Sequence, residues 1–205
     1  KTRPVHKKQM LVNVKTTDKL IAMGASTGGT VALEQIISLL PPGIPPIVVV
    51  QHMPQGFTRQ FADRLNELSE ARVKEAEEGE LIVNGTVYIA PGGIHMALER
   101  KGANLFVKLV DSERVHFQKP AVDILFESVA AQAGKNALGV LLTGMGKDGA
   151  AGLMRMKEEG ARTIAQDEAS SVVWGMPRAA VEAGAAERVL DLKEIPPALI
   201  QYSNT

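Results

Sequence analysis

Hydrophobic and polar positions alternate along this chain in two kinds of block. Short apolar runs rich in β-branched residues, such as Ile47–Val50, end at polar residues followed by proline or glycine. Longer stretches, such as Phe57–Ser69, carry apolar residues at spacings of three and four. The first pattern is typical of a strand buried on both faces, and the second of an amphipathic helix.

These blocks divide most of the sequence into alternating strands and helices. We predict strands at Leu20–Met23, Ile47–Val50, Val73–Ala76, Thr86–Ala90, Ala137–Leu142, Arg162–Ala165 and Val189–Leu192. We predict helices at Val31–Leu40, Phe57–Ser69 and Ala121–Gly134, another ending near Glu159, one at Pro177–Ala183 and one from about Pro196. Strands that alternate with helices form parallel sheets. The predicted fold is a doubly wound, Rossmann-like α/β domain with helices on both faces of the sheet.

One part of the chain departs from this alternation. Met96–Leu98 and Leu105–Val110 flank Lys101–Asn104, which has the composition of a hairpin turn. We therefore predict that the stretch Thr86–Val110 is an antiparallel addition to the parallel sheet.

Composition narrows the class of protein. The 205 residues are 45% hydrophobic and 22% charged, which suits one domain with a full core. Lys plus Arg and Asp plus Glu number 23 each, so no basic field favours nucleic acid or an anionic membrane. The chain has no cysteine, which excludes a disulfide framework and a cysteine nucleophile and fits the cytoplasm. No apolar run approaches the roughly 20 residues of a membrane helix, so no membrane insertion is expected.

The amino-terminal residues differ from the rest. Residues 1–17 are basic and show neither helical nor strand periodicity. They are predicted to be a solvated tail or the remnant of a linker to another domain, which the first residue, Lys1 instead of Met, also suggests. Residues 18–205 are predicted to form the functional domain.

The sequence from Leu20 to Thr30 has the features of a nucleophile turn. An apolar run stops at Gly24, Ser26 follows within a cluster of small residues, and a helical pattern begins after Gly29. Small residues permit a sharp turn and close approach of a substrate. The following helix directs free backbone N–H groups and its positive dipole end at the turn. Ser26 is therefore a candidate nucleophile, although it could also be a helix cap.

Two further polar residues follow predicted strands. His52 comes directly after Ile47–Val50 and Gln51, and Asp148 lies shortly after Ala137–Leu142. Reactive side chains of parallel sheets gather beyond the carboxyl ends of the strands. A serine needs a base, and the base needs an acid that orients it, so these two residues could serve Ser26. Taken singly, His52 could be a structural histidine and Asp148 a helix N-cap.

Other kinds of site fit the sequence less well. A metal centre from His52, His95 and His116 is conceivable, but it lacks the usual histidine spacing. His95 could also line the site. The glycine cluster at 24–29 could hold a phosphate, but it lacks a dinucleotide or P-loop register. A binding module without catalysis also remains open. The chain order Ser, His, Asp differs from that of α/β-hydrolases, so a different fold is expected.

Several long motifs occur together in the chain. They are IAMGASTGGT, VVVQHMPQGFTRQFADRLN, VYIAPGGIHM, LLTGMGKDGAAGL and TIAQDEASSVVWGMPRAA. In this order they resemble the catalytic domain of the bacterial chemotaxis receptor glutamate methylesterases, across about residues 18–193. One departure is Gln118-Lys119-Pro120, where members often have His-Arg-Pro. The departure lies outside the reactive residues and concerns loop or receptor contacts.

The resemblance implies a function and a set of site residues. Ser26 would be the nucleophile, His52 the base and Asp148 the acid. Backbone N–H groups of Thr27 and Met145 would lie near the oxyanion. The implied reaction is demethylation of receptor glutamate methyl esters, releasing methanol, with glutamine deamidation as a second activity and no metal or organic cofactor.

The resemblance also implies partners. These are the cytoplasmic helices of methyl-accepting chemotaxis receptors and an amino-terminal receiver domain, absent from this sequence. A chemotaxis histidine kinase would phosphorylate that receiver domain. The resemblance implies a cytoplasmic enzyme of two-component signalling that acts in chemotactic adaptation, and it implies no nucleic acid partner.

Overall fold

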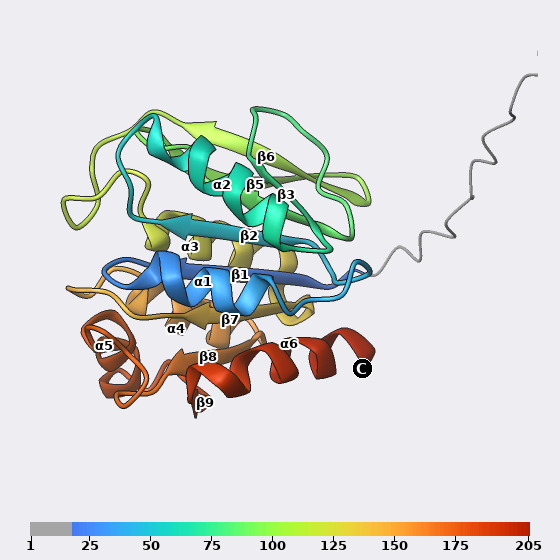
Figure 1. Cartoon of the computed structure of the whole chain (residues 1–205). Coiled ribbons are helices and arrows are strands. Elements are labelled where there is room, and N and C mark those ends of the chain that lie inside the picture. The colour runs from blue at the N-terminus through green and yellow to red at the C-terminus, as the bar shows by residue number, and fades with distance from the viewer. Residues whose placement is uncertain (1–17) are drawn as a thin grey trace, which may run out of the picture.

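A computed structural model describes residues 18–205 (Figure 1). The predicted tail or linker at residues 1–17 lies outside the described residues. Within residues 18–205, the longest sheet is parallel, with strand order β3-β4-β2-β1-β7-β8-β9. Its strands are β1 Leu20–Ala25, β2 Ile47–Gln51, β3 Arg72–Glu75, β4 Thr86–Ile89, β7 Ala137–Leu141, β8 Arg162–Gln166 and β9 Arg188–Leu190.

Helices connect these strands and cover both faces of the sheet. They are α1 Gly29–Ile37, α2 Phe57–Leu68, α3 Val122–Ala133, α4 Ala150–Glu158, α5 Met176–Glu182 and α6 Ile195–Asn204, with short 3₁₀ turns at Gly134–Asn136 and Leu192–Glu194. In Figure 1, α1 and α2 lie in front of the sheet, and α3 and α4 lie behind it. The predicted doubly wound α/β fold is confirmed. No helix in the described part of the chain has the length and apolarity needed to cross a bilayer.

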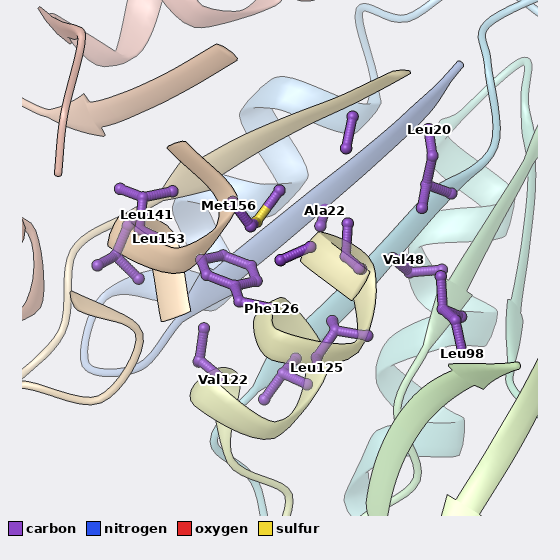
Figure 2. Close-up of a cluster of buried hydrophobic side chains, with 14 of the residues drawn as sticks. Leu20, Ala22, Val48, Leu98, Val122, Leu125, Phe126, Leu141, Leu153 and Met156 are labelled. Atoms are coloured by element: carbon purple, nitrogen blue, oxygen red, sulfur yellow. The ribbon is translucent and has the colours of Figure 1, made fainter. Parts of the chain in front are cut away.

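Successive side chains along the strands point to opposite faces of the sheet and pack into two separate hydrophobic cores. In β1, Leu20 and Ala22 join a cluster with Phe126 of α3 and residues of α4, which Figure 2 shows. The intervening Ile21 and Met23 join the other cluster, which packs against α1, α2 and α6. Because both faces of β1 are fully buried, the strand reads as an unbroken apolar run.

The predicted antiparallel addition is partly wrong. Thr86–Ile89 is β4, which pairs in parallel with both β2 and β3 inside the main sheet. Its residues are all buried, as expected for a strand covered on both faces. Only β5 (His95–Lys101) and β6 (Asn104–Val110) form an antiparallel hairpin, and they make a separate sheet.

The order of the strands locates the crevice. From β1 the chain continues to β2 on one side, and it later returns to β7 on the other side. Such a change of direction leaves a crevice beyond the carboxyl ends of the central strands, where ligands of open α/β sheets bind. The segments that follow β1, β2 and β7 therefore meet at one edge.

Gly24 in β1 allows α3 to pack closely against this edge. A Cβ added at Gly24 would lie 2.3 Å from Cγ1 of Val122, the first residue of α3. We expect Gly24→Ala to destabilise the domain by about 1–3 kcal/mol, because the core cannot absorb the methyl group without moving α3. Urea unfolding measures the change. The control is Gly43→Ala, because nothing lies within 4 Å of that position; equal unfolding midpoints for the two variants would contradict the expectation.

Candidate active site

Ser26 directly follows β1 and is held through its backbone. Its N–H donates to the carbonyl of Thr143 at 2.9 Å. Its carbonyl accepts from Gln51 Nε2 at 2.9 Å and from the Gly29 N–H at 2.7 Å. Its hydroxyl has no hydrogen-bond partner among residues 18–205. The main chain is therefore fixed while the hydroxyl remains available.

His52 is brought beside Ser26 by the parallel pairing of β1 and β2. Ala25 and Gln51 are partners in this register, and the His52 N–H donates to the Ala25 carbonyl at 3.1 Å. The two residues that follow, Ser26 and His52, therefore leave neighbouring strand ends. Both line one hollow of about 420 Å³, together with Thr27, Met53 and Phe57 among others.

The His52 ring has one paired and one unpaired nitrogen. Its Nε2 lies 2.6 Å from Oδ2 of Asp148, and the two side chains are 5% and 2% exposed. Its Nδ1 is buried and has no hydrogen-bond partner in the described part of the chain. A carboxylate only accepts, so Nε2 carries the proton and Nδ1 keeps a lone pair. This is the tautomer that a general base requires. No hydrogen bond joins Nδ1 to the Ser26 hydroxyl in the described residues, and such contacts are often open without substrate.

Asp148 does more than orient His52. Its carboxylate also accepts from the N–H groups of Val122 at 2.7 Å and Asp123 at 2.9 Å, which belong to the first turn of α3. The position of Asp148 in the sequence is also compatible with an N-cap of the helix that follows it. The structure shows instead that Asp148 caps α3, and this fixes the carboxylate at the site.

Two free backbone N–H groups belong to the segments that follow β1 and β7. Within residues 18–205, the N–H groups of Thr27 and Met145 have no hydrogen-bond acceptor. Both residues are exposed, and Met145 is 72% exposed. Gly28, with φ of +82°, is the N-cap of α1 and turns the chain directly after Thr27. Free N–H groups beside a nucleophile are the groups that stabilise an oxyanion.

The histidine cluster considered from sequence does not form. His95 is fully buried: its Nε2 donates to the Glu113 carbonyl at 2.8 Å and its Nδ1 accepts from the Ala121 N–H at 3.0 Å. It supports the loop before α3 and does not line the hollow. His116 Nε2 bonds Oδ2 of Asp123 at 2.8 Å. The expectation that His95 lines the site is therefore wrong. His52 pairs with Asp148, and among residues 18–205 no hydrogen bond joins it to His95 or His116.

Two buried glutamines and one buried aspartate at this edge belong to no motif predicted from the sequence. Gln51 is 3% exposed and Gln166 is fully buried, each at the carboxyl end of an apolar strand. Gln51 holds the Ser26 carbonyl, and Gln166 Oε1 accepts from the Thr143 N–H at 2.8 Å. The Asp123 carboxylate accepts hydrogen bonds from two backbone N–H groups at the start of α4. A polar residue that ends an apolar run is the signal that could have identified the glutamines.

A serine, a histidine and an aspartate at the carboxyl edge of a doubly wound sheet are the arrangement of an α/β serine hydrolase, although the chain order differs from the α/β-hydrolase fold. The comparisons define the family. Residues 21–199 match the CheB methylesterase family, and the chain belongs to it.

Named relatives are similar over most of this chain. It is 56% identical over 189 residues to protein-glutamate methylesterase/protein-glutamine glutaminase 4 of Anaeromyxobacter dehalogenans, covering 92% of this chain and 53% of the relative. It is 54% identical over 180 residues to the protein-glutamate methylesterase/protein-glutamine glutaminase of Escherichia coli K12, covering 88% and 52%. The chain thus spans about half the length of these curated relatives.

A solved structure supports the same assignment. The crystal structure of the Thermotoga maritima CheB methylesterase catalytic domain superposes with a TM-score of 0.88 at 44% sequence identity. The match covers 89% of this chain and 97% of that domain. The described fold is therefore that of the catalytic domain in this family.

Proposed function

We propose that this domain hydrolyses glutamate methyl esters on the cytoplasmic helices of chemotaxis receptors. The observation that carries the proposal is the unpartnered Nδ1 of His52, a residue that Asp148 orients and that lines the same hollow as Ser26. The names of the relatives give the substrate class. The reaction needs neither a metal nor an organic cofactor.

The first half of the reaction forms an acyl-enzyme. His52 Nδ1 takes the hydroxyl proton of Ser26 as Oγ attacks the ester carbonyl. The imidazolium that forms faces the Asp148 carboxylate through Nε2, which stabilises its charge. When the tetrahedral intermediate collapses, the C–O bond to the methoxy group breaks. The proton on Nδ1 goes to that oxygen, and methanol leaves.

Backbone N–H groups stabilise the oxyanion in this proposal. The proposed donors are the free N–H groups of Thr27, on the turn after β1, and of Met145, on the loop after β7. Losing one such donor typically costs about 10²- to 10³-fold in rate. Their contribution comes from the backbone, so the exposed side chains of both residues are free to vary.

The second half releases the glutamate. Water loses a proton to His52 Nδ1 and attacks the glutamyl–Ser26 ester, and the Ser26 oxygen leaves with that proton. A carboxylate and the free enzyme result. A primary amide at the same carbonyl would release ammonia through the same steps, so receptor glutamine is the second proposed substrate, in line with the names of the relatives.

Methanol release from a methylated chemoreceptor fragment tests the proposed reaction. We expect methanol in proportion to the methylated glutamates present, and ammonia when glutamines replace them. A receptor fragment with unmodified glutamates is the control. If neither product forms with any receptor fragment, the domain is better explained as a binding module that uses the glycine-rich edge.

We further propose regulation by a receiver domain, with residues 18–205 as the catalytic unit and residues 1–17 as the linker. The support is that curated relatives with this activity in their names are about twice as long as the matched region. The receiver domain would cover the site until a chemotaxis histidine kinase phosphorylates it, so we expect the domain alone to be active. The same methanol assay decides this: an unphosphorylated receiver domain joined in cis should lower the rate. This system would operate in the cytoplasm.

A further inference from the structure

At the site, the N-termini of α3 and α4 are each capped by an aspartate carboxylate from the other segment. Asp148, which precedes α4, accepts from the first N–H groups of α3. Asp123, in the first turn of α3, accepts through Oδ1 from the N–H groups of Gly149 at 3.0 Å and Gly152 at 2.7 Å, at the start of α4. Neither helix has a side-chain cap from its own N-cap residue. Each carboxylate therefore satisfies donors that the other helix leaves open.

These reciprocal hydrogen bonds form a closed ring that includes Asp148. The Asp123 N–H binds the Asp148 carboxylate, and the Asp123 carboxylate binds the N–H of Gly149, the residue directly after Asp148. A Cβ on Gly152 would lie 3.0 Å from Oδ1 of Asp123 and 2.6 Å from Cβ of Phe126, so only glycine lets the helices approach this closely. The orientation of Asp148 thus depends on where Asp123 lies.

A third side chain holds the remaining oxygen of Asp123. His116 Nε2 lies 2.8 Å from Oδ2, and the two side chains are 32% and 6% exposed. One ligand atom each from His116, Asp123 and Asp148 lies within 4.8 Å of the others. Burial and the Asp123 charge raise the pKa of Glu127, one turn along α3, while Arg155 opposes this shift. The His116 ring therefore faces the Asp123 carboxylate directly.

His116 reaches Asp123 from a strained turn. His116 and Phe117 have φ of +50° and +63°, in the left-handed region that L residues avoid. The flanking residues exchange both backbone bonds: the Val115 N–H donates to Gln118 at 3.0 Å, and the Gln118 N–H donates to Val115 at 2.9 Å. Such two-residue turns usually contain Asn-Gly. Strain of this kind persists only where the surroundings hold it, and it gathers at functional sites.

We propose that His116 is a positioning residue for ester hydrolysis, acting through Asp123 to hold Asp148 and thereby His52. The proposal rests on the proposed function. His116 holds Oδ2 of Asp123, so that Oδ1 of Asp123 keeps its hydrogen bonds to the N–H groups at the start of α4. These bonds keep the backbone of α3 and α4 in place around Asp148. The side chain touches no reacting atom.

The experiment compares three variants of the protein. His116→Gly removes the imidazole and suits the left-handed backbone, so the turn is kept. His116→Gln restores an N–H donor toward Asp123. Phe117→Gly is the matched control, because this residue is in the same turn and 92% exposed, and no side-chain hydrogen bond to Asp123 comes from it. For each variant, kcat and KM are measured by methanol release, and proton NMR follows the downfield resonance of the His52 Nε2 proton.

We expect His116→Gly to lower kcat by roughly 10- to 100-fold with KM unchanged, because a misplaced orienting group slows the chemical step without weakening substrate binding. The His52 proton resonance should shift in the same variant. His116→Gln should recover most of the rate, and Phe117→Gly should match the wild type.

Three results would overturn the positioning role. They are a His116→Gly variant with wild-type kcat and an unmoved resonance, a glutamine variant as slow as the glycine variant, and a Phe117→Gly variant that is equally slow. Inactive wild-type protein would instead contradict the proposed function. In that case the resonance still decides the positioning role, because it needs no substrate.

Discussion

Ser26→Ala is expected to lower kcat for methanol release by about 10⁶-fold, the scale seen when a serine hydrolase loses its nucleophile. The alanine cannot form the acyl-enzyme. Stability should change by less than about 0.5 kcal/mol, because the Ser26 hydroxyl makes no hydrogen bond among residues 18–205 and every backbone bond at this position remains. The assay uses a methylated receptor fragment, and urea unfolding checks the fold.

Ser38→Ala is the matched control for that variant. Ser38 lies at the other end of α1, and among residues 18–205 its hydroxyl donates only to the Gln35 carbonyl. We expect wild-type rates from it. Equal methanol release from Ser26→Ala and the wild type would remove Ser26 as the nucleophile and leave the Gly24–Gly29 edge as a binding surface.

Asp148→Asn is expected to lower kcat by about 10⁴-fold, as when the orienting acid of other serine hydrolases is neutralised. The amide has no charge to stabilise the imidazolium of His52. An amide NH₂ turned toward Nε2 would also force the ring proton onto Nδ1, which would then be unable to act as the base. The methanol assay gives the rate.

Asp148→Asn should also weaken the domain, because one carboxylate currently accepts from His52 and from two N–H groups of α3. Asp111→Asn is the control, because its exposed carboxylate pairs only with Lys119 among residues 18–205 and lies outside the Asp148 contacts. If Asp148→Asn kept the wild-type rate while the control behaved normally, Asp148 would be a structural cap of α3 and not part of the reaction.

The local elements could be predicted because their causes are local. The apolar run Ile47–Val50 and the helical spacing in Phe57–Ser69 are properties of neighbouring residues, and both elements appear as β2 and α2. The predicted first helix, Val31–Leu40, is α1 at Gly29–Ile37. It starts earlier because Gly28 takes a left-handed conformation as N-cap and Gly29 packs against Gln51.

Pairing between strands was harder to predict. Thr86–Ile89 is followed by Pro91-Gly92-Gly93 and a hairpin, and this suggested an antiparallel partner nearby in sequence. The strand instead lies between β2 and β3, because Val87, Tyr88 and Ile89 are buried on both faces of the sheet in that position. The possible positions of this strand differ in its contacts with parts of the chain that are distant in sequence. The hydrophobic periodicity of the strand does not indicate those contacts.

The sequence by itself determined the family, the order of strands and helices, and the expectation that Ser26, His52 and Asp148 follow three strands that meet at one edge. Only the tertiary structure decided which nitrogen of His52 is free and which helix Asp148 caps. It also showed that Asp123 and His116 complete the ring around Asp148. The physical reason is that these properties are hydrogen bonds between separate elements, such as the His52–Asp148 contact, and their geometry exists only after the helices pack on the sheet.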